Sequence, residues 1–130
     1  MTGGAIASLL AMILPLPDSV SAAENAADTK KFYEKVVQLQ PGNANAHFDL
    51  GNVYLREKRY DDALGHYEKA GKIGLAASRM DSFYFNLSLC YAGLGRMDYA
   101  VRSLEDCIKV NPVHREAKDL LAIYKRHESY

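Results

Sequence analysis

One sequence pattern occurs twice in this chain, first from Leu50 to Ala70 and again from Leu87 to Cys107. The two copies have identical residues at matching offsets: Leu50/Leu87, Tyr54/Tyr91, Arg59/Arg96, Asp61/Asp98, Ala63/Ala100 and Glu68/Glu105. Within each copy the apolar residues recur at the three- and four-residue spacing of one helix face. The duplication therefore predicts two copies of a unit made of a helix, a tight turn and a second helix.

Small residues recur where the two helices of each unit would meet. Without bulk beyond Cβ, antiparallel backbones can approach each other closely at such positions. Large residues such as Tyr54 and Tyr67 would then fill the flanks. The small residues of the two copies are Gly51, Ala63 and Ala70 in the first and Ser88, Ala100 and Cys107 in the second.

This order of small and aromatic residues, ended by Asn111-Pro112, resembles the tetratricopeptide repeat, whose period is about 34 residues. The resemblance covers two repeats, residues 44–80 and 81–114. It implies an all-α fold in which antiparallel helix-turn-helix repeats form a short right-handed α-solenoid. Equivalent leucines here are 87 − 50 = 37 residues apart. We assign the extra residues to Gly71–Met80 and expect an irregular joint there.

Two helical segments flank the repeats. Residues 115–128 predict a closing helix with a charged outer face, and residues 24–43 match the second half of an earlier repeat. The helix expected at 24–40 lacks a first helix, so its apolar face of Tyr33, Val36 and Val37 is partly unpaired. Three alternatives remain open for it: an N-terminal cap, a homodimer through residues 24–40, or packing on residues 5–14.

The N-terminal residues 1–23 differ from the rest of the chain because they contain no Lys or Arg and one acid, Asp18. An apolar run from Ala5 to Leu16, followed by small residues near Ala22, is typical of a secretory signal peptide. At about a dozen residues the run is shorter than the roughly 20 of a membrane-spanning helix. We expect export to the periplasm or secretion, with no span after removal. The alternatives are an uncleaved membrane anchor and a packing helix.

The charge balance gives no sign of a nucleic-acid partner. The chain has 16 Lys plus Arg and 16 Asp plus Glu, so no net field attracts a polyanion. Its four histidines lack the spacing of a zinc site, and no Cys-x-x-Cys motif occurs. We therefore expect no catalytic, metal or cofactor site and no enzyme activity.

The sequence also predicts whether two histidines and two cysteines are buried or exposed. His47 replaces a large aromatic of the repeat pattern and is expected to be packed, whereas His66 is expected to face solvent. Cys90 and Cys107 fall at small apolar positions and are expected to be buried free thiols. A disulfide between them in an oxidising compartment is the alternative.

The family resemblance implies that the first helix of each repeat lines a concave groove that binds a peptide or helix of another protein. Mapped onto this chain, the groove residues are Asn45, Phe48, Asp49, Asn52, Leu55, Arg56, Ser82, Phe85, Asn86 and Leu89. The resemblance therefore implies an adaptor or scaffold. A structural assembly protein that self-associates through its N-terminal helix is the alternative.

Asn52 and Asn86 match the asparagines of the carboxylate clamp found in chaperone-tail-binding members of the family. The lysine of that clamp is replaced by Phe48, and Glu116 and Leu120 stand where its other bases would be. Capture of a terminal carboxylate is therefore not expected. Phe48 and Phe85 would offer apolar contacts to a ligand, or alternatively cover the gap between the repeats.

Overall fold

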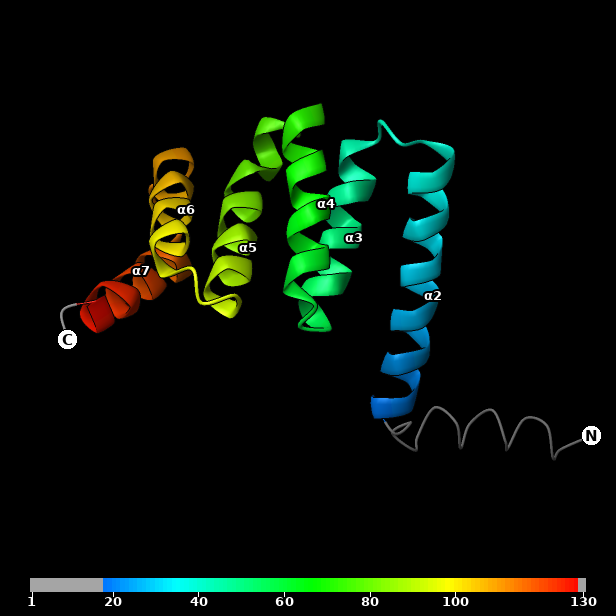
Figure 1. Ribbon diagram of the computed structural model, residues 1–130, viewed down its shortest axis with the longest axis horizontal. Coiled ribbons are helices and arrows are strands. Elements are labelled where there is room, and N and C mark those ends of the chain that lie inside the picture. Colours follow the sequence, from blue (N-terminus) through cyan, green and yellow to red (C-terminus); the bar gives the residue numbers. More distant parts are fainter. Residues whose placement is uncertain (1–17, 129–130) are drawn as a thin grey trace, which may run out of the picture.

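The computed structural model describes residues 18–128, and within this range the protein is entirely helical, as expected. The elements follow one another in a row (Figure 1). They are α2 (Asp18–Leu39), α3 (Ala44–Arg56), α4 (Tyr60–Ile73), the short 3-10 helix η1 (Ala77–Arg79), α5 (Met80–Gly93), α6 (Met97–Val110) and α7 (Arg115–Glu128). None of the helices in this range is long and apolar enough to cross a membrane.

The first repeat is the hairpin of α3 and α4, and small residues lie where the two helices meet. A Cβ atom on Gly51 would lie 2.5 Å from Cε1 of Tyr67, inside any real contact distance. Ala63, Tyr67 and Ala70 are all 0% exposed. The predicted close approach of the helices is confirmed, and the ring of Tyr67 fills the space that Gly51 leaves.

The second repeat is the hairpin of α5 and α6, which repeats this packing. Ser88, Ala100 and Cys107 are fully buried. The start of α4 also contacts the end of α5, because a Cβ on Gly93 would lie 2.5 Å from Cζ of Tyr60. Asn111 follows the last residue of α6, as expected for a residue before proline.

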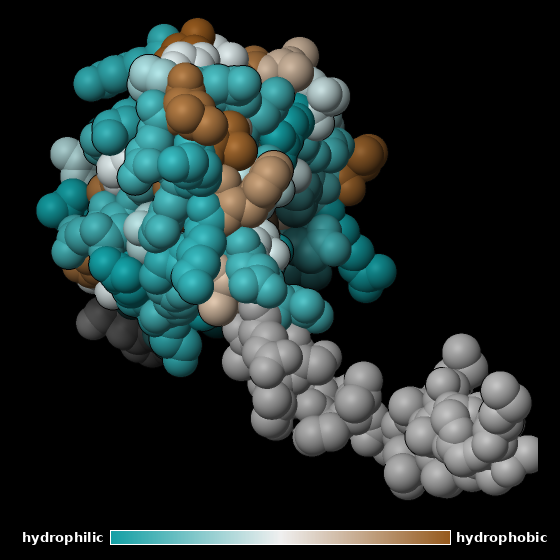
Figure 2. Space-filling view, turned by 90° about the vertical axis from the view of Figure 1, so that its right-hand side faces the viewer, coloured by the Kyte–Doolittle hydropathy of each residue, from teal (hydrophilic) through white to brown (hydrophobic). Residues whose placement is uncertain are grey.

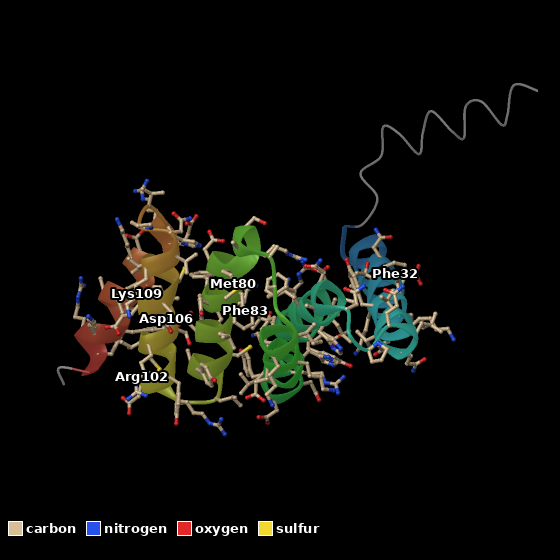
Figure 3. The ribbon with its side chains drawn as sticks, turned by 90° about the horizontal axis from the view of Figure 1, so that it is seen from above. Phe32, Met80, Phe83, Arg102, Asp106 and Lys109 are labelled. Atoms are coloured by element: carbon tan, nitrogen blue, oxygen red, sulfur yellow. The ribbon has the colours of Figure 1, made fainter. Side chains whose placement is uncertain are left out.

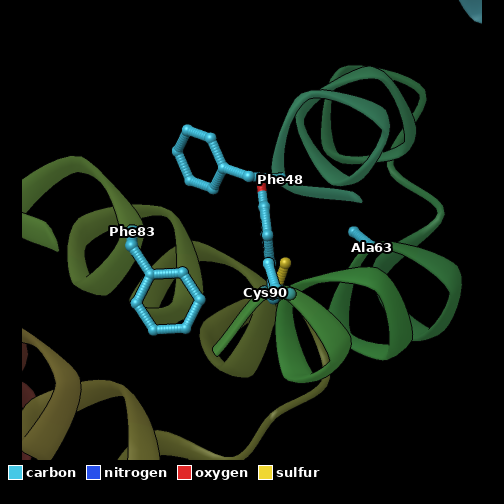
Figure 4. Close-up of a cluster of buried hydrophobic side chains, with 6 residues drawn as sticks. Phe48, Ala63, Phe83 and Cys90 are labelled. Carbon is cyan, nitrogen blue, oxygen red and sulfur yellow. The ribbon is translucent and has the colours of Figure 1, made fainter. Parts of the chain in front are cut away.

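An aromatic cluster joins the two repeats (Figure 4). The ring centroids of Phe48 and Tyr67 are 5.7 Å apart, and those of Tyr67 and Phe83 are 6.2 Å apart in an edge-on arrangement. Aromatic pairs prefer such offset or edge-on contacts. The cluster therefore packs the second repeat against the first.

The joint between the repeats is irregular, as the extra residues predict. Helix α4 ends at Ile73, and Gly74 adopts φ +111°, which a side chain rarely tolerates. The chain then forms η1 before α5 begins at Met80. Gly74, Ala76, Ala77 and Ser78 of this joint are exposed, whereas Leu75 and Met80 are partly buried and pack against the aromatic cluster.

Helix α2 packs beside α3 and is longer than the helix expected at 24–40. An ion pair of 3.0 Å joins Lys30 Nζ to Glu57, and the hydroxyl of Tyr54 donates to Glu34 at 3.3 Å. On its outer side Phe32, labelled in Figure 3, is 61% exposed and Leu39 is 71% exposed. The apolar segment 5–14 lies outside the described residues.

Helix α7 closes the other end of the row (Figure 1). Ala117 is fully buried with Leu104 and Cys107, while Leu120, Leu121 and Tyr124 pack around them. The opposite face of α7 carries exposed charged residues, among them Arg115, Lys118 and Asp119. The expected closing helix with a polar outer face is confirmed.

Candidate functional site

The predicted groove residues come from α3 and α5, which contact each other directly. We call the surface formed by these ten residues the groove face. Their exposure differs widely. Asn45, Arg56 and Ser82 are exposed, whereas Asp49, Asn52, Leu55, Phe85, Asn86 and Leu89 are partly buried and Phe48 is buried.

The centre of the groove face is a side-chain hydrogen-bond network. Asn86 Nδ2 donates to Asn52 Oδ1 at 2.8 Å, and the hydroxyl of Tyr67 donates to the same oxygen at 2.6 Å. Burial raises the pKa of Tyr67 above its ordinary value, so the phenol remains a donor. Because Asn52 accepts both bonds through one oxygen, neither bond uses its NH₂ group, and the oxygen of Asn86 is likewise not used in the bond between the two amides.

Arg79 covers the beginning of α3. Its Nη1 donates to Asn45 Oδ1 at 3.0 Å, and its Nη2 pairs with Asp49 Oδ1 at 2.5 Å. The guanidinium carbon lies 4.5 Å from the centre of the Phe48 ring. A planar guanidinium suits this combination of two oxygen acceptors and an aromatic face.

Phe48 is therefore not a groove contact in this structure. It is 2% exposed, packed on Tyr67 and Phe83 and covered by Arg79. The alternative interpretation, that Phe48 fills the gap between repeats, is the one the structure has. The expectation of an accessible ring fails because the aromatic cluster needs Phe48 to join the repeats.

The second half of the groove face is more apolar. Phe85 is partly exposed and lies over His114, with ring centroids 5.1 Å apart. His114 also lies 3.5 Å from a carboxylate oxygen of Glu116. Leu89 is partly exposed one helical turn beyond Phe85. Apolar and polar contacts are thus both available here.

A hollow adjoins the groove face where α2 meets the end of α3. It is lined by Ala26, Thr29, Val53, Arg56 and Glu57. Arg56, the last residue of α3, belongs both to the groove face and to the lining of this hollow. It places a positive charge at the end opposite Arg79.

His66 is not solvated as expected but stacked behind α3. Its Nδ1 lies 3.1 Å from Nδ1 of His47, and its ring stacks on Tyr54 at 5.5 Å. Burial lowers the pKa of His66, and the neighbouring His47 and Lys69 lower it further. His47 is 4% exposed and its Nε2 donates to the Pro41 carbonyl at 2.9 Å, which confirms it as a packed imidazole.

Among the described residues, no group of three or more His, Cys, Asp or Glu side chains is placed to hold a metal ion. Cys90 and Cys107 are free thiols and both are buried, as expected. Burial raises the pKa of Cys90 to about 12 and that of Cys107 to about 11. Such thiols are mostly protonated at neutral pH.

Three residues of this region were not predicted from the sequence: Arg79, Tyr67 as a hydrogen-bond donor, and His114. Arg79 follows Asn45 by 79 − 45 = 34 residues, one family period, but it lies in the irregular joint, where the repeat alignment gives no position. The hydroxyl of Tyr67 reaches the groove face from α4, behind it. The pattern of the first helices alone therefore omits Arg79 and Tyr67. It also omits His114, which lies between α6 and α7.

Comparison with known proteins agrees with this architecture. Two family models described as tetratricopeptide repeat match residues 21–81 and 81–114. Hsp70-Hsp90 organizing protein 3 of Arabidopsis thaliana is 29% identical over 74% of this chain and 17% of its own length. Serine/threonine-protein phosphatase 5 of Mus musculus is 29% identical over 74% of this chain and 19% of its own length. The chain therefore spans less than a fifth of either relative.

Solved structures share the fold at lower identity. The first TPR of Spaghetti (RPAP3), bound to an HSP90 peptide, aligns with a TM-score of 0.75 at 15% identity and covers 87% of both chains. YrrB, described as a TPR protein with an unusual peptide-binding site, aligns with a TM-score of 0.72 at 22% identity over 85% of this chain and 56% of its own. The duplicated hairpins, their small-residue contacts and these family matches agree: the chain belongs to the tetratricopeptide repeat family.

Proposed function

We propose that the chain is a protein–protein interaction module that holds an extended peptide or a helix of a partner protein on the groove face. The amide pair of Asn52 and Asn86 is the observation that supports this most directly. The bond between them leaves a donor, the Asn52 NH₂, and an acceptor, the Asn86 oxygen. These groups complement the C=O and N–H groups of a peptide backbone.

Similar proteins support the same role. One structural neighbour holds an HSP90 peptide, and another is described as having an unusual peptide-binding site. The groove face of this chain differs from a carboxylate clamp, because Phe48 is buried and Glu116 and Leu120 supply no base. The ligand we propose is therefore held by its backbone and apolar side chains, rather than by a terminal carboxylate.

The test is site-specific photo-crosslinking in the native host. A crosslinking residue at Ser82, exposed on the groove face, is expected to capture a partner. The same residue at Lys72, exposed on α4, is the matched control and is expected to capture much less. Asn86→Ala combined with the Ser82 crosslinker should reduce capture. Equal capture from Lys72 would move the site off the groove face.

We further propose that the chain acts without catalysis and without nucleic acid. The support is the equal number of basic and acidic residues and the binding role proposed above. The phosphatase relative matches over 19% of its length only, so its name assigns no activity here. If the purified chain shifts a labelled RNA or DNA duplex in a gel at physiological salt, the proposal that it acts without nucleic acid is contradicted.

Self-association through α2 is a second candidate. Phe32 and Leu39 are exposed and seven residues apart (39 − 32 = 7), so they lie along one side of the helix. Figure 2, which views this end of the molecule, shows hydrophobic side chains among hydrophilic ones rather than a continuous patch. If this contact operates, Phe32→Ser with Leu39→Ser converts a dimer to a monomer in sedimentation velocity. Ile123→Ser, an equally simple loss of an exposed apolar side chain on α7, should not.

We propose that residues 1–22 direct export to the periplasm or the exterior, with an uncleaved membrane anchor as the alternative. The apolar run and the small residues after it support this. Because α2 begins at Asp18, removal of residues 1–22 would shorten this helix at its start. Intact mass from fractionated native cells is the test: loss of these residues supports export, whereas an intact chain in the soluble fraction contradicts it.

A further inference from the structure

The first part of the groove face is filled by a side chain of the protein itself. Asn45, Phe48 and Asp49 were each expected to meet a ligand, and each meets Arg79 instead. The three contacts come from consecutive turns of one helix, since Asn45 and Asp49 are four residues apart and Phe48 lies beside them. They converge on a single guanidinium group.

These three groups have the chemistry of a guanidinium receptor. The carboxylate of Asp49 neutralises the charge, the amide oxygen of Asn45 accepts a second N–H, and the ring of Phe48 supplies a π-face. The combination favours arginine over lysine, because only the planar fork can make two hydrogen bonds while stacking. The arrangement already binds a guanidinium, that of Arg79.

Arg79 is attached in a way that allows it to leave. It is the last residue of η1, and the exposed residues Gly74, Ala76, Ala77 and Ser78 precede it. Its side chain is 32% exposed, and Asp49 is 25% exposed, so the pair opens to solvent on one side. Rotation of the long arginine side chain alone would uncover the receptor, without movement of α3 or α5.

We propose that Asn45, Phe48 and Asp49 form a guanidinium pocket on the groove face, that Arg79 occupies it in the unbound protein, and that an arginine side chain of the bound partner replaces Arg79. This rests on the proposed groove function and specifies the partner as an arginine-bearing segment. The released Arg79 remains beside the groove face at the edge of the ligand.

The intramolecular competitor sets the expected affinity. A site that is open in only a fraction of molecules binds its ligand with a dissociation constant raised by the inverse of that fraction. If Arg79 occupies the pocket in about nine molecules of ten, wild-type protein binds a free guanidinium ligand about tenfold more weakly than a variant without Arg79. A partner recovers this loss through its other contacts on the groove face.

The pocket itself is tested with the full chain, its Arg79→Ala variant and the probe N-acetyl-arginine methylamide. Backbone amide NMR of Asn45, Phe48 and Asp49 is expected to show saturable shifts in the variant at about tenfold lower probe concentration than in wild type. Arg79→Ala with Asp49→Asn should lose the response. Arg96→Ala is the matched control, since Arg96 is an exposed residue just before α6. N-acetyl-glutamate methylamide is the probe control.

The partner's part is tested by the Ser82 crosslink. Replacement of Arg79 by alanine removes the competitor, so capture from Ser82 is expected to rise. A fall in capture would mean that Arg79 itself contacts an acidic group of the partner, and would overturn the proposal. The proposal would also be overturned if the Arg79→Ala variant is folded but its backbone amide shifts do not change when the arginine probe is added. If that variant does not fold, Arg79→Gln removes the charge with less loss of cover over Phe48.

The two proposals fail separately. If the Arg79→Ala variant shows no response to the arginine probe but capture from Ser82 is intact, the guanidinium pocket is rejected and the groove function stands. Probe binding without any capture from Ser82 rejects both the groove function and the partner arginine that depends on it.

Discussion

The ring of Tyr67 lies directly over Gly51, so close that a Cβ atom on this glycine would stand 2.5 Å from Cε1 and 2.7 Å from Cδ1 of the tyrosine. The two residues belong to α3 and α4, and Tyr67 is fully buried between them. The contact fixes the spacing of the first hairpin. It also aims the tyrosine hydroxyl at Asn52, at the centre of the groove face.

Gly51→Ala is therefore expected to destabilise the protein by about 1–3 kcal/mol, the usual cost of overpacking a filled core. Gly65→Ala is the matched control, because Gly65 lies inside α4 and a Cβ added there would have nothing within 4 Å. That change should stabilise the chain by roughly 0.5–1 kcal/mol through helix propensity. Urea unfolding followed by circular dichroism measures both. Equal effects of the two substitutions would mean that Tyr67 moves aside freely.

Ala63→Leu tests the same interface from the other helix. Ala63 is 0% exposed where α4 meets α3, so the bulk of a leucine cannot be placed there without displacing a neighbour. We expect a loss of about 1–3 kcal/mol. Lys72→Leu introduces the same side chain at an exposed site of α4 and should change the melting temperature little. A shift for Ala63→Leu as small as that of the control would contradict the helix pairing.

The sequence predicted the hairpins because their signals are local and repeated. Gly51, Ala63, Ser88 and Ala100 recur at fixed offsets, and each lies where two helices touch. The ends of the helices followed from residues with strong backbone preferences, such as Gly74 and Pro112.

The composition of the groove face was harder to predict, because it depends on side chains that reach it from outside the first helices. Arg79 covers Phe48 from the inserted joint, and Tyr67 reaches Asn52 from α4. Helix periodicity places a residue on a face but does not say which neighbour covers it. The partial burial of His66 could not be predicted from periodicity for the same reason, because its contacts with His47 and Tyr54 depend on the tertiary pairing of α3 and α4.

Cys90 and Cys107 are expected to resist thiol reagents in the native protein. Both are 0% exposed, and burial raises the pKa of each well above neutral pH, to about 12 and about 11. Since the thiolate is the reactive form, modification should wait for unfolding. Ellman's reagent should therefore react slowly in buffer and rapidly with both thiols in guanidinium chloride. Fast reaction of either thiol with the folded chain would place it at the surface.

Tyr67→Phe tests the hydrogen bond that supports the groove face. The substitution keeps the ring over Gly51 and removes the donor to Asn52 Oδ1, which retains its bond from Asn86. A loss of about 0.5–1.5 kcal/mol is expected from one such bond. Tyr99→Phe, at a residue 53% exposed on α6, is the control and should be close to neutral. If Tyr67→Phe is equally neutral, the Asn52 amide is held by Asn86 alone.

His66 should make the stability of the protein depend on pH in the mildly acidic range. Burial lowers its pKa in the folded state, with further lowering by His47 and Lys69 that outweighs the opposing effect of Asp62 and Glu34. The unfolded chain, with a histidine pKa of about 6.5, therefore binds more protons than the folded chain below that pH. The free energy of unfolding must then decrease as pH falls through about 6.5.

The geometry of the His47 and His66 pair also predicts that the free energy of unfolding decreases as pH falls. His47 Nε2 donates to the Pro41 carbonyl, and the two Nδ1 atoms face each other at 3.1 Å, a distance at which only one of them can hold the proton between them. His66→Gln should flatten the fall in urea midpoint between about pH 7 and about pH 5. His127→Gln, at an exposed histidine of α7, should leave the slope unchanged. An unchanged slope in His66→Gln would assign the acid sensitivity to other groups.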